Sequence, residues 1–393
     1  MNVSGNGNHK SKVSVLRKRA LSITVGAGVL IVIFGCTMFV SSDNLSQFGA
    51  KPTDEKREQM KKSSIYDGKI FKNTVETNVG PHGGFWDMMG RWLFGKELRE
   101  PKGDIPVVPL TRESFDTPPP EGLRVTWMGH STVLIEIGGK RILTDPVWSK
   151  RCSPFSFAGP TRFFDPPIAL ANLPKIDVVL ISHDHYDHLD KMVVTVLAKT
   201  GVQFYVPLGV GAHLEKWGID KSQITEADWW DVVGGPDENL QFTSAPVRHF
   251  SGRSMTGRNG TLWTSWVISN GKHNVYFSGD TGPFPGFGEI GEKFGPFDLT
   301  LIKIGSYDKG WPDVHLNPEQ AVEANIALKG KVMMPIHHST FNLAFHDWFE
   351  PPEWVLKEAK KKSVRLMMPI AGEMVVPETA PEPTRWWMEV DKN

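Results

Sequence analysis

A short stretch near the middle of the chain, residues 176–190, constrains the fold more than any other part of the sequence. An apolar run over residues 176–181 is typical of a buried strand. Three histidines and an aspartate follow within six positions: His183, His185, Asp187 and His188. Groups this polar are costly to desolvate unless something binds them. A loop that follows a strand is also where α/β sheets place ligands.

The donor atoms of these side chains favour a metal ion over a polar surface loop, which is the alternative. Imidazole nitrogens and carboxylate oxygens without a thiolate suit Zn²⁺ or a similar divalent transition metal. His183 and His185 alternate, so both can reach one ion from an extended loop. Asp187 and His188 follow where the chain must turn into a helix, and they can face a second ion.

The pattern His-x-His-x-Asp-His after an apolar strand resembles the signature of the metallo-β-lactamase superfamily. The resemblance implies an α+β fold, a four-layer αββα sandwich with a two-metal site between its sheets. It also implies three further ligands downstream, in the order His, Asp, His. Residues of these types follow predicted strands in that order: His249, Asp280 and His337.

The same resemblance distributes the ligands over two Zn²⁺ ions per chain. One ion is held by His183, His185 and His249. The other is held by Asp187, His188 and His337, and Asp280 bridges the two. Two divalent ions that share a bridge lower the pKa of a water between them and stabilise developing charge. The predicted reaction is therefore metal-assisted hydrolysis.

Other polar residues receive supporting roles. His130 is interpreted as a hydrogen-bonded structural histidine beneath the site, and Asp145 as a carboxylate that orients a ligand histidine. His213 and His273 are expected at the surface.

Segments beyond the ligands resemble the N-acylphosphatidylethanolamine phospholipase D family over about residues 123–377. They are residues 127–132, 143–149, 159–163, 183–190, 315–321, 335–337 and 340–341. The family hydrolyses N-acylphosphatidylethanolamine to N-acylethanolamine and phosphatidic acid, which implies a phospholipid substrate and a membrane. Carried over by position, Asp187 and His315 are catalytic, and Tyr186 and His315 contact the lipid.

Two other functions are considered. The first is a metal-dependent lactonase or phosphodiesterase that acts on a soluble compound. A wide apolar entrance would favour the lipid, and a closed polar pocket would favour the soluble compound. The second is a membrane-tethered binding protein on an inactive hydrolase scaffold, which the intact ligand positions disfavour.

The N-terminus predicts a membrane anchor. Residues 1–19 form a basic tail, and residues 20–40 contain no charged side chain. This uncharged segment is long enough to span a bilayer. We assign residues 20–41 to this segment. The positive-inside rule places the tail in the cytoplasm and the catalytic domain outside it, on the periplasmic side if the protein is bacterial. A cleaved signal with lipidated Cys36 is the alternative.

Residues 42–122 are predicted to be a linker and an N-terminal arm, followed by the hydrolase domain at residues 123–393. Residues 42–64 are charged and are interpreted as a solvated linker. Apolar residues at helical spacing over residues 82–94 favour either an arm packed on the core or an interfacial helix that holds the active site against lipid. The chain has 44 basic and 44 acidic side chains, so its net charge does not indicate binding to nucleic acid. The sequence leaves open whether the protein forms a homodimer.

Overall fold

The computed structural model describes residues 45–80, 83–235, 239–254 and 257–392. The chain divides into two units, Met1–Gln47 and Phe48–Asn393, and the fold described below is that of the second. The predicted basic tail and apolar segment, residues 1–41, lie outside the described residues. In the part of the chain that is described, no helix is long and apolar enough to cross a membrane.

Two β-sheets form the centre of the fold. The first has the order β13-β1-β2-β3-β4-β5-β6, and the second has the order β12-β11-β10-β9-β8-β7. The strands of the first sheet are β1 (Leu123–Gly129), β2 (Thr132–Ile137), β3 (Lys140–Thr144), β4 (Val178–Leu180), β5 (Gln203–Pro207), β6 (Ile224–Ala227) and β13 (Met374–Val375). Those of the second are β7 (Val232–Gly234), β8 (Gln241–Ala245), β9 (Ser265–Ser269), β10 (Asn274–Phe277), β11 (Leu299–Lys303) and β12 (Met333–Ile336).

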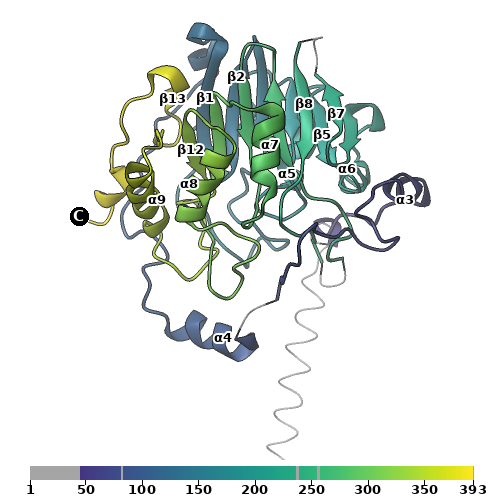
Figure 1. Ribbon diagram of the computed structural model, residues 1–393, viewed down its shortest axis with the longest axis horizontal. Helices are drawn as coiled ribbons and strands as arrows, with labels where there is room; N and C mark the ends of the chain where they lie inside the picture. Colours follow the sequence, from purple (N-terminus) through teal and green to yellow (C-terminus); the bar gives the residue numbers. More distant parts are fainter. Residues whose placement is uncertain (1–44, 81–82, 236–238, 255–256, 393) are drawn as a thin grey trace, which may run out of the picture. The chain divides into compact units, whose positions relative to one another are not determined.

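Helices cover the outer faces of both sheets (Figure 1). The first sheet is covered by α5 (Lys191–Ala198) and α6 (Gly211–Lys216), and the second by α7 (Gly286–Phe294), α8 (Pro318–Ala327) and α9 (Glu350–Lys361). Short 3₁₀ helices lie at Arg112–Phe115, Pro120–Gly122, Leu170–Asn172, Lys221–Gln223, Pro377–Thr379 and Trp386–Met388. The predicted α+β sandwich with four layers is confirmed.

The pattern of β2 shows why the sheets stack this way. Its residues are all buried, because side chains alternate between two covered faces. Val133 and Ile135 pack in the core between the sheets, where they join residues such as Trp266 of β9. Leu134 points the other way and packs with Val193 of α5. A strand that is apolar on both faces requires a layer on each side.

The segment before β1 is more ordered than its composition predicts. Residues of the expected linker form α3 (Asp54–Met60), which Thr53 caps at its N-terminus. Met60 is only 1% exposed and packs with Phe71 and Trp263. Lys56 pairs with Glu215 at 2.9 Å and with Glu226. The interpretation of residues 42–64 as a solvated linker is therefore wrong for α3, because one apolar side chain and one cation fix this helix to the core.

Elements in the second half of the chain depend on geometry that the local sequence does not indicate. Trp230 has a φ of 73° and turns the chain between β6 and β7, so residues 228–231 form no strand. Helices α7 and α9 and strand β11 were not predicted from the sequence. Helix α8 begins as its sequence indicates, with Asn317 as the N-cap, Pro318 in the first turn and a capping box to Gln320.

Replacing Met60 with alanine tests whether the arm is part of the folded domain. We expect Met60→Ala to lower the free energy of unfolding by about 2 kcal/mol, the lower end for deleting a buried methionine side chain. It should also speed proteolysis near α3. Gln59→Ala, at an exposed position of the same helix, is the matched control. Equal stability of the two variants in urea denaturation would show that the arm does not contribute to the core.

Candidate metal centre

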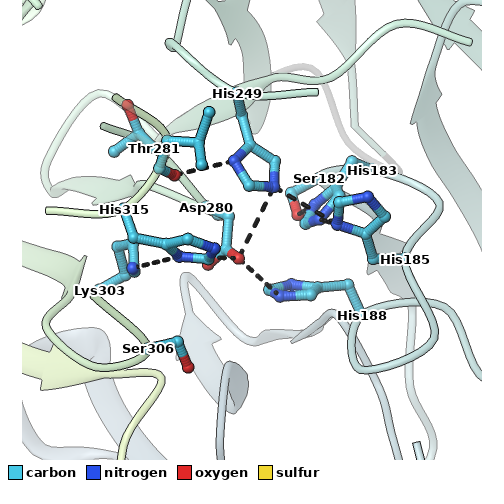
Figure 2. Close-up of polar contacts among 12 residues, drawn as sticks. Ser182, His183, His185, His188, His249, Asp280, Thr281, Lys303, Ser306 and His315 are labelled. Atoms are coloured by element: carbon cyan, nitrogen blue, oxygen red, sulfur yellow. Dashed lines mark hydrogen bonds and ion pairs between the residues drawn. The ribbon is translucent and has the colours of Figure 1, made fainter. Parts of the chain in front are cut away.

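The polar residues singled out by the sequence meet at the ends of five strands. His183, His185, Asp187 and His188 follow β4, and His249 follows β8. Asp280 follows β10, His315 lies between β11 and α8, and His337 follows β12. Figure 2 shows His188, His249 and His315 directed toward the carboxylate of Asp280. Both sheets thus contribute their carboxyl ends to one site.

Three histidines form a first group. His183 Nε2 lies 2.8 Å from His185 Nδ1, and His249 Nε2 lies 3.4 Å from the same atom. His183 and His249 are fully buried. Three imidazole nitrogens that converge on one point form a natural set of metal ligands.

A second group is built around Asp280. His337 Nε2 lies 3.2 Å from Asp280 Oδ1 and 3.3 Å from Asp187 Oδ2. His188 Nε2 lies 3.4 Å from Asp280 Oδ2, and His249 Nε2 lies 3.8 Å from that oxygen. Asp280 therefore lies between the two groups, where the sequence predicts a bridging carboxylate.

The outward nitrogen of several histidines is held by a hydrogen bond. His188 Nδ1 donates to Asp145 Oδ2 at 2.6 Å, and His249 Nδ1 donates to the carbonyl of Val314 at 2.9 Å. His183 Nδ1 donates to Ser182 Oγ at 2.9 Å. These bonds fix the tautomers, so the inward nitrogens keep their lone pairs, as is usual for metal-binding histidines. The carboxylate of Asp145 thus holds the imidazole of His188, a predicted ligand, in a fixed orientation.

The inward atoms lack the partners that buried polar groups normally have. His188 Nε2, His337 Nε2 and Asp280 Oδ1 are inaccessible to solvent and make no hydrogen bond. Such atoms are rare because each costs about 1–3 kcal/mol when left unsatisfied. A cation bound among them would satisfy all three, so the residues present fit divalent metal ions.

The electrostatics of the site point the same way. Burial lowers the pKa of His249 to about 3 and that of His183 well below its usual value, so both are neutral. Burial acts to raise the pKa of Asp280, but the imidazoles of His337 and His188 outweigh it and hold that pKa well below its usual range. His183 and His249 thus have the neutral state, and Asp280 the ionised state, that metal binding requires.

Unusual backbone conformations concentrate around these residues. His130, Ser306 and His337 have φ values of 54°, 61° and 61°, a region that side chains with a Cβ rarely adopt. Gly279 has a φ of 53°, and a Cβ there would lie 2.4 Å from Ser182 Cβ. Strain of this kind persists only where the surrounding structure fixes it, and it clusters at functional sites.

Comparison with known proteins assigns the family. The sequence profile of the beta-lactamase superfamily domain matches residues 140–338. The chain belongs to the metallo-β-lactamase superfamily.

Two related sequences and one solved structure support the assignment. An uncharacterized protein of Mycobacterium tuberculosis is 47% identical over 286 residues, which are 71% of this chain and 76% of that protein. The N-acyl-phosphatidylethanolamine-hydrolyzing phospholipase D 1 of Caenorhabditis elegans is 34% identical over 319 residues, which are 75% and 87% of the two chains. Igni18, a metallo hydrolase of Ignicoccus hospitalis, superposes with a TM-score of 0.51 and 25% identity over 64% of this chain and 97% of that one. The chain is thus a metal-dependent hydrolase of the metallo-β-lactamase fold.

Of the histidines outside the predicted ligand set, His130 lies where the sequence predicts, whereas His213 and His273 do not. His130 is buried, and its Nε2 donates to Asp187 Oδ2 at 2.9 Å, so it is a supporting residue as interpreted. His213 and His273 are only 5% and 6% exposed, so their placement at the surface is wrong. His213 links the backbone N–H of Ala50 at 2.9 Å to Asp184 at 3.1 Å. Its partners are distant in sequence and could not be foreseen.

The two residues assigned to the substrate lie in different places. His315 lines a cavity of about 320 Å³ together with Asp187, Asp280 and His337. Tyr186 does not line this cavity. Its hydroxyl donates to the carbonyl of Arg253 at 2.7 Å, and its ring lies 4.1 Å from the Arg253 guanidinium.

Lys303 is a member of the site that the sequence analysis missed. It ends β11 and is fully buried. Its Nζ donates to the carbonyl of Gly305 at 2.6 Å. It also donates to His315 Nδ1 at 2.5 Å (Figure 2). Burial lowers the pKa of Lys303 to about 7. The sequence contains a signal for this residue, because Lys303 is the charged residue that ends the apolar run of β11. This strand was not predicted from the sequence, so the position of Lys303 at a strand end was not recognised.

Removing the central carboxylate should empty the site. Wild-type protein is expected to contain about two metal equivalents, and Asp280→Ala should lose most of that metal because both ligand groups share this carboxylate. Asp220→Ala, which alters an exposed carboxylate at the start of a 3₁₀ helix, should keep it. Elemental analysis of the purified proteins is the measurement. Full metal content in Asp280→Ala would remove this residue from the ligand set.

Proposed function

We propose that this protein is a two-zinc phospholipase D-type hydrolase that converts N-acylphosphatidylethanolamine to N-acylethanolamine and phosphatidic acid. The observation that carries the proposal is the lining of the cavity at the metal centre. Apolar side chains, among them Met88, Phe250, Trp311 and Leu343, line this cavity together with the predicted ligands His185, Asp187, Asp280 and His337. A cavity that combines apolar walls with predicted metal ligands suits a substrate with long acyl chains and a phosphodiester.

The relatives support the same substrate class. The Caenorhabditis elegans protein named for hydrolysis of N-acyl-phosphatidylethanolamine covers most of this chain. The alternative, a soluble lactone or phosphodiester, would be favoured by a closed polar pocket. The lining of the cavity is mostly apolar instead.

The residues of the chain have distinct tasks in the proposed reaction. When bound, two zinc ions would make hydroxide available from water near neutral pH and stabilise charge on the phosphate. His183, His185 and His249 would hold one ion, Asp187, His188 and His337 the other, with Asp280 between them. His130 holds Asp187 in place through the bond at 2.9 Å. The apolar residues of the cavity limit the access of other water molecules.

His315 is placed to act on the substrate itself. Because Lys303 donates to His315 Nδ1, the proton of the neutral imidazole lies on Nε2, the nitrogen that Lys303 does not engage. Burial lowers the pKa of His315 well below its usual value, so the ring is a neutral hydrogen-bond donor. A donor beside the ligands can bond a phosphate oxygen more strongly as negative charge develops.

The location of the protein forms part of the proposal. The basic tail at residues 1–19 and the uncharged run at residues 20–40 would anchor the chain in a membrane, with the hydrolase domain outside the cytoplasm. Tethering would keep the enzyme at the surface that contains its substrate.

Product analysis tests the activity directly. Purified full-length protein should release N-acylethanolamine and phosphatidic acid from N-acylphosphatidylethanolamine, as identified by mass spectrometry, and a chelator should abolish this release. Hydrolysis of a soluble lactone or phosphodiester with no turnover of the lipid would contradict the proposal.

Replacing His315 tests its role in the reaction. His315→Ala should keep metal content and thermal stability near wild type but lower turnover of N-acylphosphatidylethanolamine at least tenfold, because positioned proton donors commonly contribute about 10²–10⁴-fold. His315→Gln, which retains an N–H donor, should recover part of the loss. Normal turnover by the alanine variant would exclude the residue from the reaction.

Protease accessibility tests the proposed topology. Protease added outside intact cells should cut the hydrolase domain, because the basic residues keep the N-terminus inside. Cys36→Ser should leave membrane attachment and any acyl label unchanged if the segment is an uncleaved anchor. Recovery of the full-length protein in the soluble cytosolic fraction would contradict both forms of attachment.

A further inference from the structure

Helix α4 (Gly84–Phe94) presents an apolar face to solvent. Trp86 and Phe94 are each 81% exposed, Trp92 is 62% exposed and Leu93 is 57% exposed. With 3.6 residues per turn, Trp86, Leu93 and Phe94 lie within about 100° of one another around the helix. Single exposed apolar residues need no explanation, but a cluster of this kind marks an interaction surface.

The opposite face of α4 is continuous with the metal centre. Met88 lines the cavity that contains Asp280 and His315. Met88, Met89 and Trp92 line a second cavity of about 390 Å³, whose walls are almost entirely apolar. The two cavities share Met88, Trp311 and Leu343, so they lie next to each other beside α4.

The orientation of the helix is fixed by polar contacts on its side. Arg91 makes two bonds to the Asp308 carboxylate, at 2.7 and 2.6 Å, and its guanidinium lies 4.5 Å from the centre of the Phe345 ring. Asp308 lies in the same loop as Ser306, which lines the cavity of the metal centre. A bidentate arginine–carboxylate pair has a defined geometry, so the outward face of α4 has a fixed relation to the site.

We propose that α4 is a membrane-docking helix whose Trp86, Leu93 and Phe94 enter the interfacial layer of a phospholipid bilayer. Its inner face then opens a path along which the acyl chains of a phospholipid reach the metal centre. This inference rests on the proposed lipid substrate.

Two observations identify a bilayer as the occupant of this face. Tryptophan, like tyrosine, is enriched at membrane–water interfaces, because its ring is apolar and its N–H is polar. The sequence before the helix points to the same partner, since the uncharged run ends at residue 40 and the compact unit begins at Phe48.

Fluorescence quenching by brominated lipid tests the docking. The chain contains 14 tryptophans, none of them in residues 1–85, and the exposed ones are Trp86 and Trp92. Full-length protein in phosphatidylcholine nanodiscs should lose fluorescence when the lipid carries bromine near the headgroup. The double variant Trp86→Phe, Trp92→Phe should lose this quenchable component. Equal quenching of the two proteins, or none in the wild type, would overturn the proposal.

Kinetics separate docking from catalysis. Leu93→Gln combined with Phe94→Gln should lower turnover of long-chain N-acylphosphatidylethanolamine in bilayers at least tenfold. Hydrolysis of a short-chain, monomeric N-acylphosphatidylethanolamine should not change. The matched control is Val232→Gln, at a position that is also 57% exposed but lies on β7, far from α4 in Figure 1. Equal loss on both substrates, or equal loss in the control, would overturn the docking role.

The two proposals fail in different ways. If lipid is not hydrolysed but the quenching behaves as described, the docking helix stands and the proposed substrate is wrong. If lipid is hydrolysed normally without quenching, the substrate stands and the docking helix is wrong. Conversion of a dimer to a monomer by the Leu93 and Phe94 substitutions, without quenching in the wild type, would identify the face as a contact between two copies instead.

Discussion

The buried carboxylate of Asp145 is the interaction on which the arrangement of the metal loop depends. It lies just after β3, is fully buried, and accepts hydrogen bonds from Ser182 N at 2.7 Å, Ser182 Oγ at 2.6 Å and His188 Nδ1 at 2.6 Å. One side chain thus joins the ends of two neighbouring strands to a ligand histidine. Because each bond is made away from water, loss of the carboxylate would leave several buried donors unsatisfied, at about 1–3 kcal/mol each.

A second contact fixes the metal loop from the opposite side. Asp184, between the predicted ligands His183 and His185, accepts hydrogen bonds from His213, Thr261 and the backbone of Gly252. His213 in turn accepts from the N–H of Ala50. Gly49 is required here, since a Cβ at that position would lie 2.2 Å from His213 Nδ1. The start of the arm therefore contributes to the geometry of a site that is far away in sequence.

The sequence predicted those features that depend on neighbouring residues. The apolar run of β4 followed by His183 and His185 was recognised because the signal lies within a few residues. Features that depend on distant partners were missed. His213 looked exposed because Ala50 and Asp184 were not known to be near it, and α3 looked solvated because Met60 is its one buried residue. The turn at Trp230 depends on a positive φ. Glycine is the usual sequence signal for such a conformation, and this position holds tryptophan instead.

Lys303 was not predicted to belong to the site because its role also depends on a partner outside its own strand, His315. A buried ammonium is costly unless it is paired or hydrogen-bonded, and this one is held by Gly305 and His315. The carboxylates of Asp280 and Asp187 act to raise its pKa, but burial is the larger effect and lowers it to about 7. The lysine thus orients His315 without adding a full fixed charge beside the ligands. Removing Lys303 would free the imidazole of His315 to change its tautomer. The N–H donor that His315 presents to the cavity therefore depends on Lys303, which does not line that cavity.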